Sequence, residues 1–125
     1  MMLRDDFYFV TETGKNSSSA VYHIRLNPSH AIFKAHFPGE PVTPGVFLIQ
    51  MGRELAEDFI GRLLRLKFLK NVKFLSVLSP ADTLEFCFQI TKLTYSENGD
   101  EVTAMMNAEA DGKQLLKMSF VATIR

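Results

Sequence analysis

One long helical segment among strands is the feature that most constrains how this chain can fold. Residues 43–64 predict a helix, because Thr43 is a favourable N-cap and proline is favoured at the first helical position. Its first turn, Val46-Phe47-Leu48-Ile49, is apolar on every side, which is typical of a buried helix. A charged set further along predicts a side that faces solvent: Arg53, Glu54, Glu57 and Asp58. The start of such a helix has to be covered by a larger element.

Most of the remaining sequence predicts strands. Alternating hydrophobicity bounded by turn residues marks six of them, at residues 7–13, 20–26, 72–78, 83–94, 101–110 and 113–124. Asn98-Gly99 and Asp111-Gly112 predict tight hairpin turns, and a single helical turn is expected near residues 31–35. About six strands, the last four as a meander, predict an α+β fold in which an antiparallel sheet wraps around one long helix.

Length and composition fit a single globular domain over residues 1–125. Fourteen basic residues balance fourteen acidic ones, so nothing in the charge favours nucleic acid as a partner. The N-terminus carries charges instead of a long apolar run, and no stretch has the length of a membrane span. We therefore expect a cytoplasmic protein with neither a membrane nor a nucleic-acid partner.

The cysteine and the scattered histidines predict little chemistry. Cys87 is the single cysteine, so no intrachain disulfide can form, and it reads as a thiol on a strand. His23 is expected to point outward from a strand, and His30 to cap the loop before the helix. Three scattered histidines and one cysteine do not predict a metal site, and no cofactor is expected.

Residues 36–50 carry the strongest chemical signal. His36 lies in a proline-rich loop that leads directly into the helix. At a helix start the first N–H groups lack intrahelical partners, and the dipole favours negative charge. Gly45 has no side chain, so a ligand can approach its N–H closely. The pattern fits a base beside an oxyanion site, but the spacing alone favours a loop histidine bonded to a backbone carbonyl.

This stretch resembles the signature of the 3-hydroxyacyl-(acyl carrier protein) dehydratases of bacterial fatty-acid synthesis. The match runs through His-Phe-Pro-Gly-x-Pro at residues 36–41, then Pro-Gly-Val at residues 44–46, then an apolar run. A weaker similarity extends over most of the chain, including residues 79–84 and 111–113. The resemblance implies a hot-dog fold, with the helix enclosed by the sheet, and an obligate dimer with two active sites at the interface.

The resemblance also implies a role for each matching residue. His36 would abstract the C2 proton of a 3-hydroxyacyl thioester. The N–H of Gly45 would bond the thioester carbonyl, and the backbone carbonyl of Val42 would orient the histidine. Phe37 and Phe47 are the expected aromatic substrate-binding residues. Phe47, with Leu48 and Met51, fits either an apolar acyl tunnel or ordinary core.

Gln50 departs from the family pattern. At this position the family has a Glu or Asp, supplied by the partner subunit, which protonates the leaving hydroxyl; a glutamine amide can only hydrogen-bond. The family often has the carboxylate first and glutamine four residues later, whereas here Glu54 follows Gln50. Glu54 lies about 6 Å further along the helix axis. It reads either as a displaced acid or as the start of the solvent-facing stripe.

Three functions remain open on these residues. A dehydratase would use His36, with Gln50 orienting the hydroxyl or Glu54 acting as acid. A thioesterase of the same fold would use Gln50 to position a water. A non-catalytic subunit would bind acyl thioesters in a heterodimer whose other chain supplies the carboxylate. We prefer the dehydratase, because the other motif residues are intact.

A basic stretch follows the predicted helix. Residues 62–73 contain five basic side chains and no acidic one: Arg62, Arg65, Lys67, Lys70 and Lys73. Arg62, Arg65 and Lys67 in particular fit a docking surface for an acidic acyl carrier protein, or equally a solvated helix end. The expected partners are thus an acyl carrier protein or coenzyme A thioester and a second subunit, in a homodimer, a higher oligomer of dimers or a heterodimer.

Overall fold

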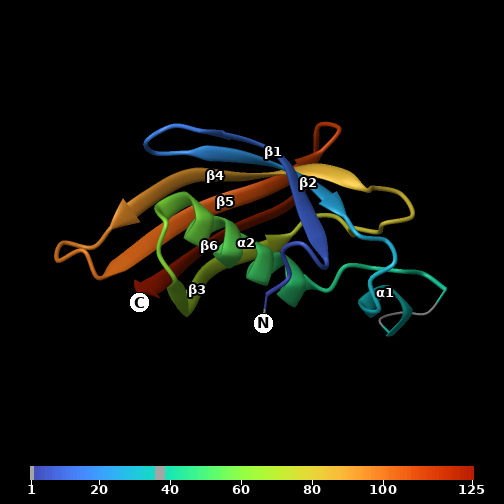
Figure 1. Cartoon of the computed structure of the whole chain (residues 1–125), viewed down its shortest axis with the longest axis horizontal. Helices are drawn as coiled ribbons and strands as arrows, with labels where there is room; N and C mark the ends of the chain where they lie inside the picture. Colours follow the sequence, from blue (N-terminus) through green and yellow to red (C-terminus); the bar gives the residue numbers. More distant parts are fainter. Residues whose placement is uncertain (1, 36–38) are drawn as a thin grey trace.

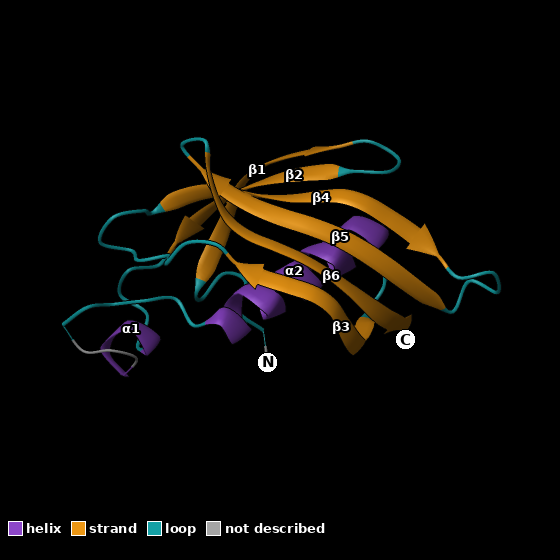
Figure 2. Ribbon diagram, turned by 180° about the vertical axis from the view of Figure 1, so that it is seen from behind, coloured by secondary structure: helices purple, strands orange, loops and turns teal. Residues whose placement is uncertain are grey.

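A computed structural model describes residues 2–35 and 39–125 of the chain. In the described part, one six-stranded antiparallel sheet is formed by β1 (Tyr8–Lys15), β2 (Ala20–Leu26), β3 (Leu64–Phe74), β4 (Glu85–Tyr95), β5 (Glu101–Ala110) and β6 (Lys113–Ile124). The strands lie in the order β1-β2-β4-β5-β6-β3. The helices are α1 (Ile32–Ala35) and α2 (Gly45–Ile60), and the sheet curves around α2 (Figures 1 and 2). The predicted α+β fold, with about six strands around one long helix, is confirmed.

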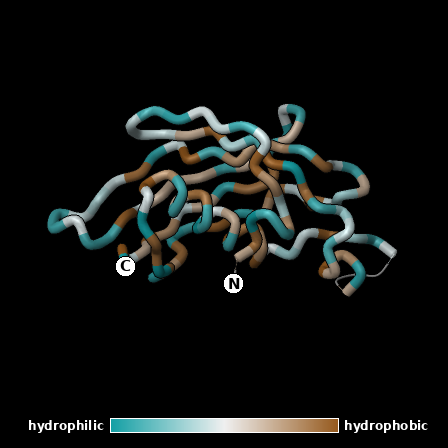
Figure 3. Tube along the Cα trace, viewed as in Figure 1, coloured by the Kyte–Doolittle hydropathy of each residue, from teal (hydrophilic) through white to brown (hydrophobic). Residues whose placement is uncertain are grey.

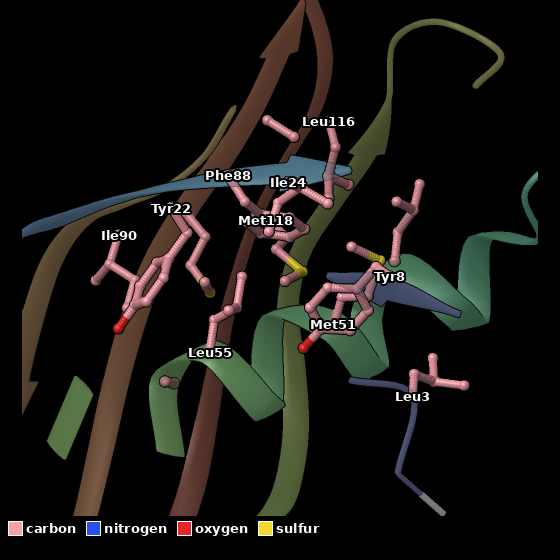
Figure 4. Close-up of a cluster of buried hydrophobic side chains, with 14 of the residues drawn as sticks. Leu3, Tyr8, Tyr22, Ile24, Met51, Leu55, Phe88, Ile90, Leu116 and Met118 are labelled. Atoms are coloured by element: carbon pink, nitrogen blue, oxygen red, sulfur yellow. The ribbon is translucent and has the colours of Figure 1, made fainter. Parts of the chain in front are cut away.

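Helix α2 packs against the concave face of the sheet through fully buried apolar side chains. Met51 and Leu55 point from α2 toward Phe88 and Met118 of the sheet (Figure 4). A Cβ atom at Gly52 would collide with the side chain of Met118, so the absence of a side chain at this position lets α2 approach the sheet closely. Apolar residues follow the helix and strands, whereas the loop tips are hydrophilic (Figure 3).

The start of α2 differs from the sequence-based prediction. Thr43 was expected as the N-cap and Pro44 as the first helical residue, but α2 begins at Gly45 and the extended Pro44 is the N-cap without a side-chain cap bond. The carbonyl oxygen of Pro44 accepts the first helical bonds, from the N–H groups of Phe47 (3.0 Å) and Leu48 (3.4 Å). The N–H of Thr43 donates to the carbonyl oxygen of Leu78 at 2.8 Å. This bond ties Thr43 to the segment after β3 and not to the first turn of α2.

The end of α2 was also predicted too late. The helix ends at Ile60, because Gly61 takes a left-handed conformation (φ 71°) and its N–H donates to the carbonyl of Glu57 at 2.9 Å. The chain then enters β3 at Leu64, so the predicted strand at residues 72–78 was placed too far along the sequence. Arg65 and Lys67 therefore lie on a strand and not at a helix end.

The position of β3 changes the predicted topology. β3 pairs with β6 and forms an edge of the sheet, so only β4, β5 and β6 make a consecutive meander instead of the four strands expected. The connection of residues 75–84 carries the chain from this edge back to β4, beside β2. Among the described residues, no helix combines the length and the apolar character needed to cross a membrane.

A buried carboxylate joins the N-terminal segment to α2. Glu54 is only 4% exposed, so its predicted place on a solvent-facing stripe is wrong. Its carboxylate accepts hydrogen bonds from the backbone N–H groups of Leu3 (2.7 Å) and Arg4 (2.9 Å) and from the hydroxyl of Tyr8 (2.9 Å). Burial, followed by the charge of Glu54, raises the pKa of Tyr8, so this hydroxyl remains a donor. A buried charge is tolerated only with such partners.

Asp58, one turn further along α2, links three elements at the surface. Its carboxylate accepts hydrogen bonds from Tyr22 (2.8 Å), Arg4 (3.1 Å) and Lys15 (3.1 Å). Burial by itself would raise the pKa of Asp58, but these hydrogen bonds outweigh it and hold the pKa below its ordinary value. The ionised form of Asp58 is therefore the one that stabilises the fold.

Replacing Glu54 tests the buried anchor. We expect Glu54→Ala to lower the free energy of unfolding by about 3 kcal/mol and Glu54→Gln by about 1–2 kcal/mol, because the amide retains one acceptor for the buried donors. Urea denaturation measures both changes. Glu97→Ala, in the exposed turn between β4 and β5, is the matched control and should change stability by less than about 0.5 kcal/mol. Equal changes in unfolding free energy for Glu54→Ala and Glu97→Ala would contradict the role of Glu54 as a buried anchor.

Asp58 should make stability depend on pH in the acid range. Because its pKa is lower in the folded state than the ordinary 3.8, its contribution is present above that value and is lost as the pH falls through the folded pKa. The difference in unfolding free energy between wild type and Asp58→Asn should be constant above about pH 5 and shrink below about pH 4. A difference that stays unchanged down to pH 2 would show that the folded pKa of Asp58 is not lowered.

Candidate functional site

The start of α2 lines a cavity of about 440 Å³. Its walls come from the loop before α2, the first turn of α2 and the segment that follows β3: Val42, Thr43, Pro44, Gly45, Leu48, Phe74, Leu75, Ser76, Val77 and Leu78. Most of these side chains are apolar, while the helix start contributes N–H groups without intrahelical partners. A ligand with an apolar part and an electron-rich oxygen fits such a lining.

Gly45 lies in the wall of this cavity, directly beneath an aromatic ring. The Cζ atom of Phe74 lies 2.7 Å from the point that a Cβ atom on Gly45 would occupy, so any side chain here would displace the ring. Phe74 itself is 51% exposed. The N–H of Gly45, which is the predicted donor to the thioester carbonyl, thus lies in the same wall as an aromatic ring that is half exposed to solvent.

The predicted base lies outside the described residues. This holds for His36 and for the neighbouring Phe37, so the proposed bond between His36 and the carbonyl of Val42 remains a prediction. Val42 itself lines the cavity beside Gly45. The described end of the loop before α2, residues 42–44, forms part of the cavity wall.

Gln50 is held by hydrogen bonds along α2. Its Nε2 donates to Oε2 of Glu54 at 2.7 Å, and its Oε1 accepts from Nε of Arg53 at 3.4 Å. Gln50 lies five residues after Gly45, which is about 7.5 Å along the axis and about 140° around the helix. In the described part of the chain Gln50 is not among the residues that line the cavity. Gly45 and Gln50 of one chain therefore lie on different faces of α2.

Glu54 has little capacity left for acid catalysis. Oε1 accepts from Arg4 and Tyr8, and Oε2 accepts from Leu3 and Gln50. Both oxygens are thus occupied, and the side chain is buried. This arrangement favours a supporting role, in which Glu54 orients the amide of Gln50, over a displaced acid.

Phe47 packs into an aromatic cluster and not into the cavity wall. Its ring centroid lies 4.9 Å from that of Phe7 and 6.1 Å from that of His30. His30 caps the loop as predicted, because its Nδ1 accepts from the N–H of Ile32 at 3.1 Å. Of the three tunnel candidates, Leu48 lines the cavity, whereas Met51 belongs to the core.

The three predicted carrier-docking residues lie at the opposite end of α2 from the cavity. Arg62 donates to the backbone oxygen of Arg125 (3.0 Å), Lys67 pairs with Glu101 (2.6 Å), and Arg65 is exposed. The 16-residue helix is about 24 Å long, and β3 returns along it to bring Phe74 back to the helix start. Within one chain, these basic residues and the cavity are not brought together.

Cys87 lies beside His23 across the β2–β4 pair, a contact that the sequence did not reveal. The Sγ atom is 3.5 Å from Nδ1 of His23. Burial, and then the charge of Glu109, raises the pKa of the Cys87 thiol, and a protonated thiol is a poor nucleophile. No group of three metal-ligating side chains occurs in residues 2–35 and 39–125.

Thr43 and Phe74 are among the cavity residues that were not predicted as part of the site. Thr43 was predicted only as a helix cap, and Phe74 only as part of a strand at residues 72–78. Nothing in the sequence places Phe74 beside Gly45 or in the same wall as Thr43. Their proximity depends on the path of the segment after β3, which only the tertiary structure defines.

Comparison with known proteins places the chain among dehydratases. The family model described as ApeI-like, ApeI dehydratase, matches residues 12–110. A 3-hydroxyacyl-[acyl-carrier-protein] dehydratase FabZ from Lactococcus lactis subsp. lactis is 30% identical over 119 residues, which cover 90% of this chain and 75% of that enzyme. The FabZ of Latilactobacillus sakei subsp. sakei is 33% identical over 81 residues, which cover 59% of this chain and 58% of that enzyme.

Solved structures share the fold. A chain of the dehydratase heterocomplex ApeI:P from Xenorhabdus doucetiae superposes with a TM-score of 0.73 at 18% identity, covering 92% of this chain and 96% of that one. A hypothetical thioesterase with coenzyme A from Streptococcus pneumoniae has a TM-score of 0.63 at 9% identity, covering 94% and 85%. These likenesses confirm the predicted hot-dog fold. With a family model that spans residues 12–110, the chain belongs to the ApeI-like dehydratase family and is related to the FabZ dehydratases.

Proposed function

We propose that residues 1–125 form one hot-dog domain that binds a 3-hydroxyacyl thioester at the start of α2 and removes water to give a trans-2-enoyl thioester. The observation that carries this proposal is the apolar cavity whose wall includes Gly45 at the helix N-terminus. The membership in a dehydratase family supports the reaction type. The acyl carrier, either an acyl carrier protein or coenzyme A, would bring the thioester to this cavity.

The first half of the proposed reaction uses groups at the helix start. His36 takes the C2 proton, and the electron pair moves toward the thioester oxygen. The N–H of Gly45 donates to that oxygen as it gains negative charge, and the helix dipole favours the same charge. An apolar cavity strengthens these interactions, because the local dielectric is low.

The second half of the reaction requires a proton for the departing hydroxyl. The amide of Gln50 cannot supply one, and its Nε2 already donates to Glu54. A homodimer would therefore return the proton from His36 to the hydroxyl, at a rate about two to four orders of magnitude below that of a site with a general acid. We expect slow turnover by the chain alone.

The hydrogen bond between Gln50 and Glu54 also favours a second candidate function, that of a subunit in a heterodimer. If Gln50 reaches the active site of the partner subunit, that site lacks a general acid. The site that contains His36 of this chain can still receive a carboxylate from a subunit of a different sequence. A heterodimer with a carboxylate-bearing chain would then hold one complete site. The similar fold of a chain from the ApeI:P heterocomplex is consistent with such an assembly.

The edge strand β3 supports pairing between two subunits. In the described part of the chain, one side of this 11-residue strand is unpaired, and Phe68 and Leu69 on it are exposed. Antiparallel pairing of two such edges would bring the start of one β3 near the end of the other. Arg65 and Lys67 would then lie close to the partner's cavity, which reconciles a carrier-docking role with their distance from the cavity of their own chain.

Exchanging the amide and the carboxylate on α2 tests the role of Gln50. The double variant Gln50→Glu/Glu54→Gln keeps one carboxylate and one amide but restores the usual family order. We expect it to raise the elimination rate by about 100-fold over wild type, because a general acid then reaches the partner site. Product formation from a 3-hydroxyacyl thioester, followed by mass spectrometry, measures the rate.

Two single variants complete this experiment. Glu54→Gln is the matched control and should bring no gain in rate. Gln50→Glu places two carboxylates side by side, so it should be less stable than the double variant. A double variant no faster than wild type would contradict the assignment of Gln50 to the acid position.

Charge reversal tests the docking surface. The variant Arg65→Glu/Lys67→Glu should raise KM for substrate on an acyl carrier protein about tenfold, because carrier proteins are acidic and long-range attraction is lost. KM for a pantetheine-bound substrate should stay unchanged in the same variant. Equal changes for both substrates would exclude a docking role for these residues.

A further inference from the structure

The Thr43 side chain carries an unexplained polar atom. Thr43 is 5% exposed, and its Oγ1 has no hydrogen-bond partner within residues 2–35 and 39–125. Its backbone N–H is already used in the 2.8 Å bond to the carbonyl of Leu78, which fixes the residue in place. Because an unpaired buried hydroxyl is destabilising, such groups are rare in folded proteins and call for a reason.

Packing by itself does not require a hydroxyl at this position. The cavity that Thr43 lines is otherwise formed mainly by apolar side chains such as Leu48 and Leu78. Valine has the shape of threonine with a methyl group in place of the hydroxyl, so valine would fill the same volume without an unpaired group. The hydroxyl therefore lowers stability without improving the packing.

Thr43 lines the same cavity as the helix start, although its hydroxyl oxygen is itself buried. Thr43 precedes Gly45 by two residues, and Pro44 between them has no N–H to offer. The donors available at this wall are thus the Thr43 hydroxyl and the first N–H groups of α2. An unpaired hydroxyl next to unpaired N–H groups is the arrangement that binds an oxygen with growing negative charge.

We propose that the Thr43 hydroxyl donates a hydrogen bond to the thioester carbonyl of the bound substrate, together with the N–H of Gly45. This inference rests on the function proposed above and adds a residue to it. The hydroxyl is closed off from solvent in the free chain, so the ligand must open the wall. The proposal therefore requires that Phe74, which packs on Gly45 and is 51% exposed, turns outward when the ligand binds.

Two substitutions and two probes test this inference. Thr43→Val removes the hydroxyl and keeps the shape, whereas Thr43→Ser keeps the hydroxyl. The probes are S-decanoyl-pantetheine, a thioester, and S-decyl-pantetheine, a thioether that lacks the carbonyl. Calorimetric titration gives the Kd of each protein for each probe, and thermal unfolding gives the Tm of each protein.

The expected results distinguish a hydrogen bond made by the Thr43 hydroxyl from an effect of side-chain packing. Thr43→Val should bind the thioester about fivefold more weakly than wild type, which corresponds to one ordinary hydrogen bond, and should bind the thioether equally well. Thr43→Ser should bind the thioester within about twofold of wild type. The Tm of Thr43→Val should equal or exceed that of wild type, because the unpaired group is gone.

Other outcomes overturn the inference in distinguishable ways. Unchanged binding of both probes by Thr43→Val would show that the hydroxyl makes no contact with the ligand. Equal weakening for both probes would show that it does not contact the carbonyl. If wild type binds neither probe, the proposed function fails, and the role of Thr43 fails with it.

Discussion

The buried carboxylate of Glu54 determines how the N-terminal segment, β1 and α2 are held together. Its two oxygens accept from the backbone of Leu3 and Arg4, from Tyr8 and from Gln50. Because one of these donors is the amide of Gln50, the same carboxylate fixes the side chain that the proposed function assigns to the acid position. Under that proposal, the negative charge of this helix lies in a structural network and not at the acid position.

The cavity at the start of α2 is formed by two contacts. The bond between Thr43 and Leu78 ties the loop before α2 to the segment after β3, and Phe74 closes over Gly45. Together they bring helix N–H groups, a hydroxyl and apolar walls into one space. The proposed function assigns this space to the thioester carbonyl, and Gln50 is not among the described residues that line it.

The sequence predicted the fold class well, because alternating strands and the Asn98-Gly99 and Asp111-Gly112 turns are local signals. The resemblance at residues 36–46 predicted the hot-dog fold correctly. The end of α2 was missed because the signal was a single residue, Gly61, followed by more leucines. The burial of Glu54 and the cavity position of Thr43 could not be predicted, since both depend on segments distant in sequence.

We propose that this chain removes water from a 3-hydroxyacyl thioester at a site that lacks the carboxylate usual in the family. The most direct test incubates the purified protein with a 3-hydroxyacyl thioester on an acyl carrier protein and follows the products by mass spectrometry, beside His36→Ala. We expect slow formation of the 2-enoyl product by wild type and none by the variant. Release of free acid, or equal product formation by both proteins, would contradict the proposed elimination.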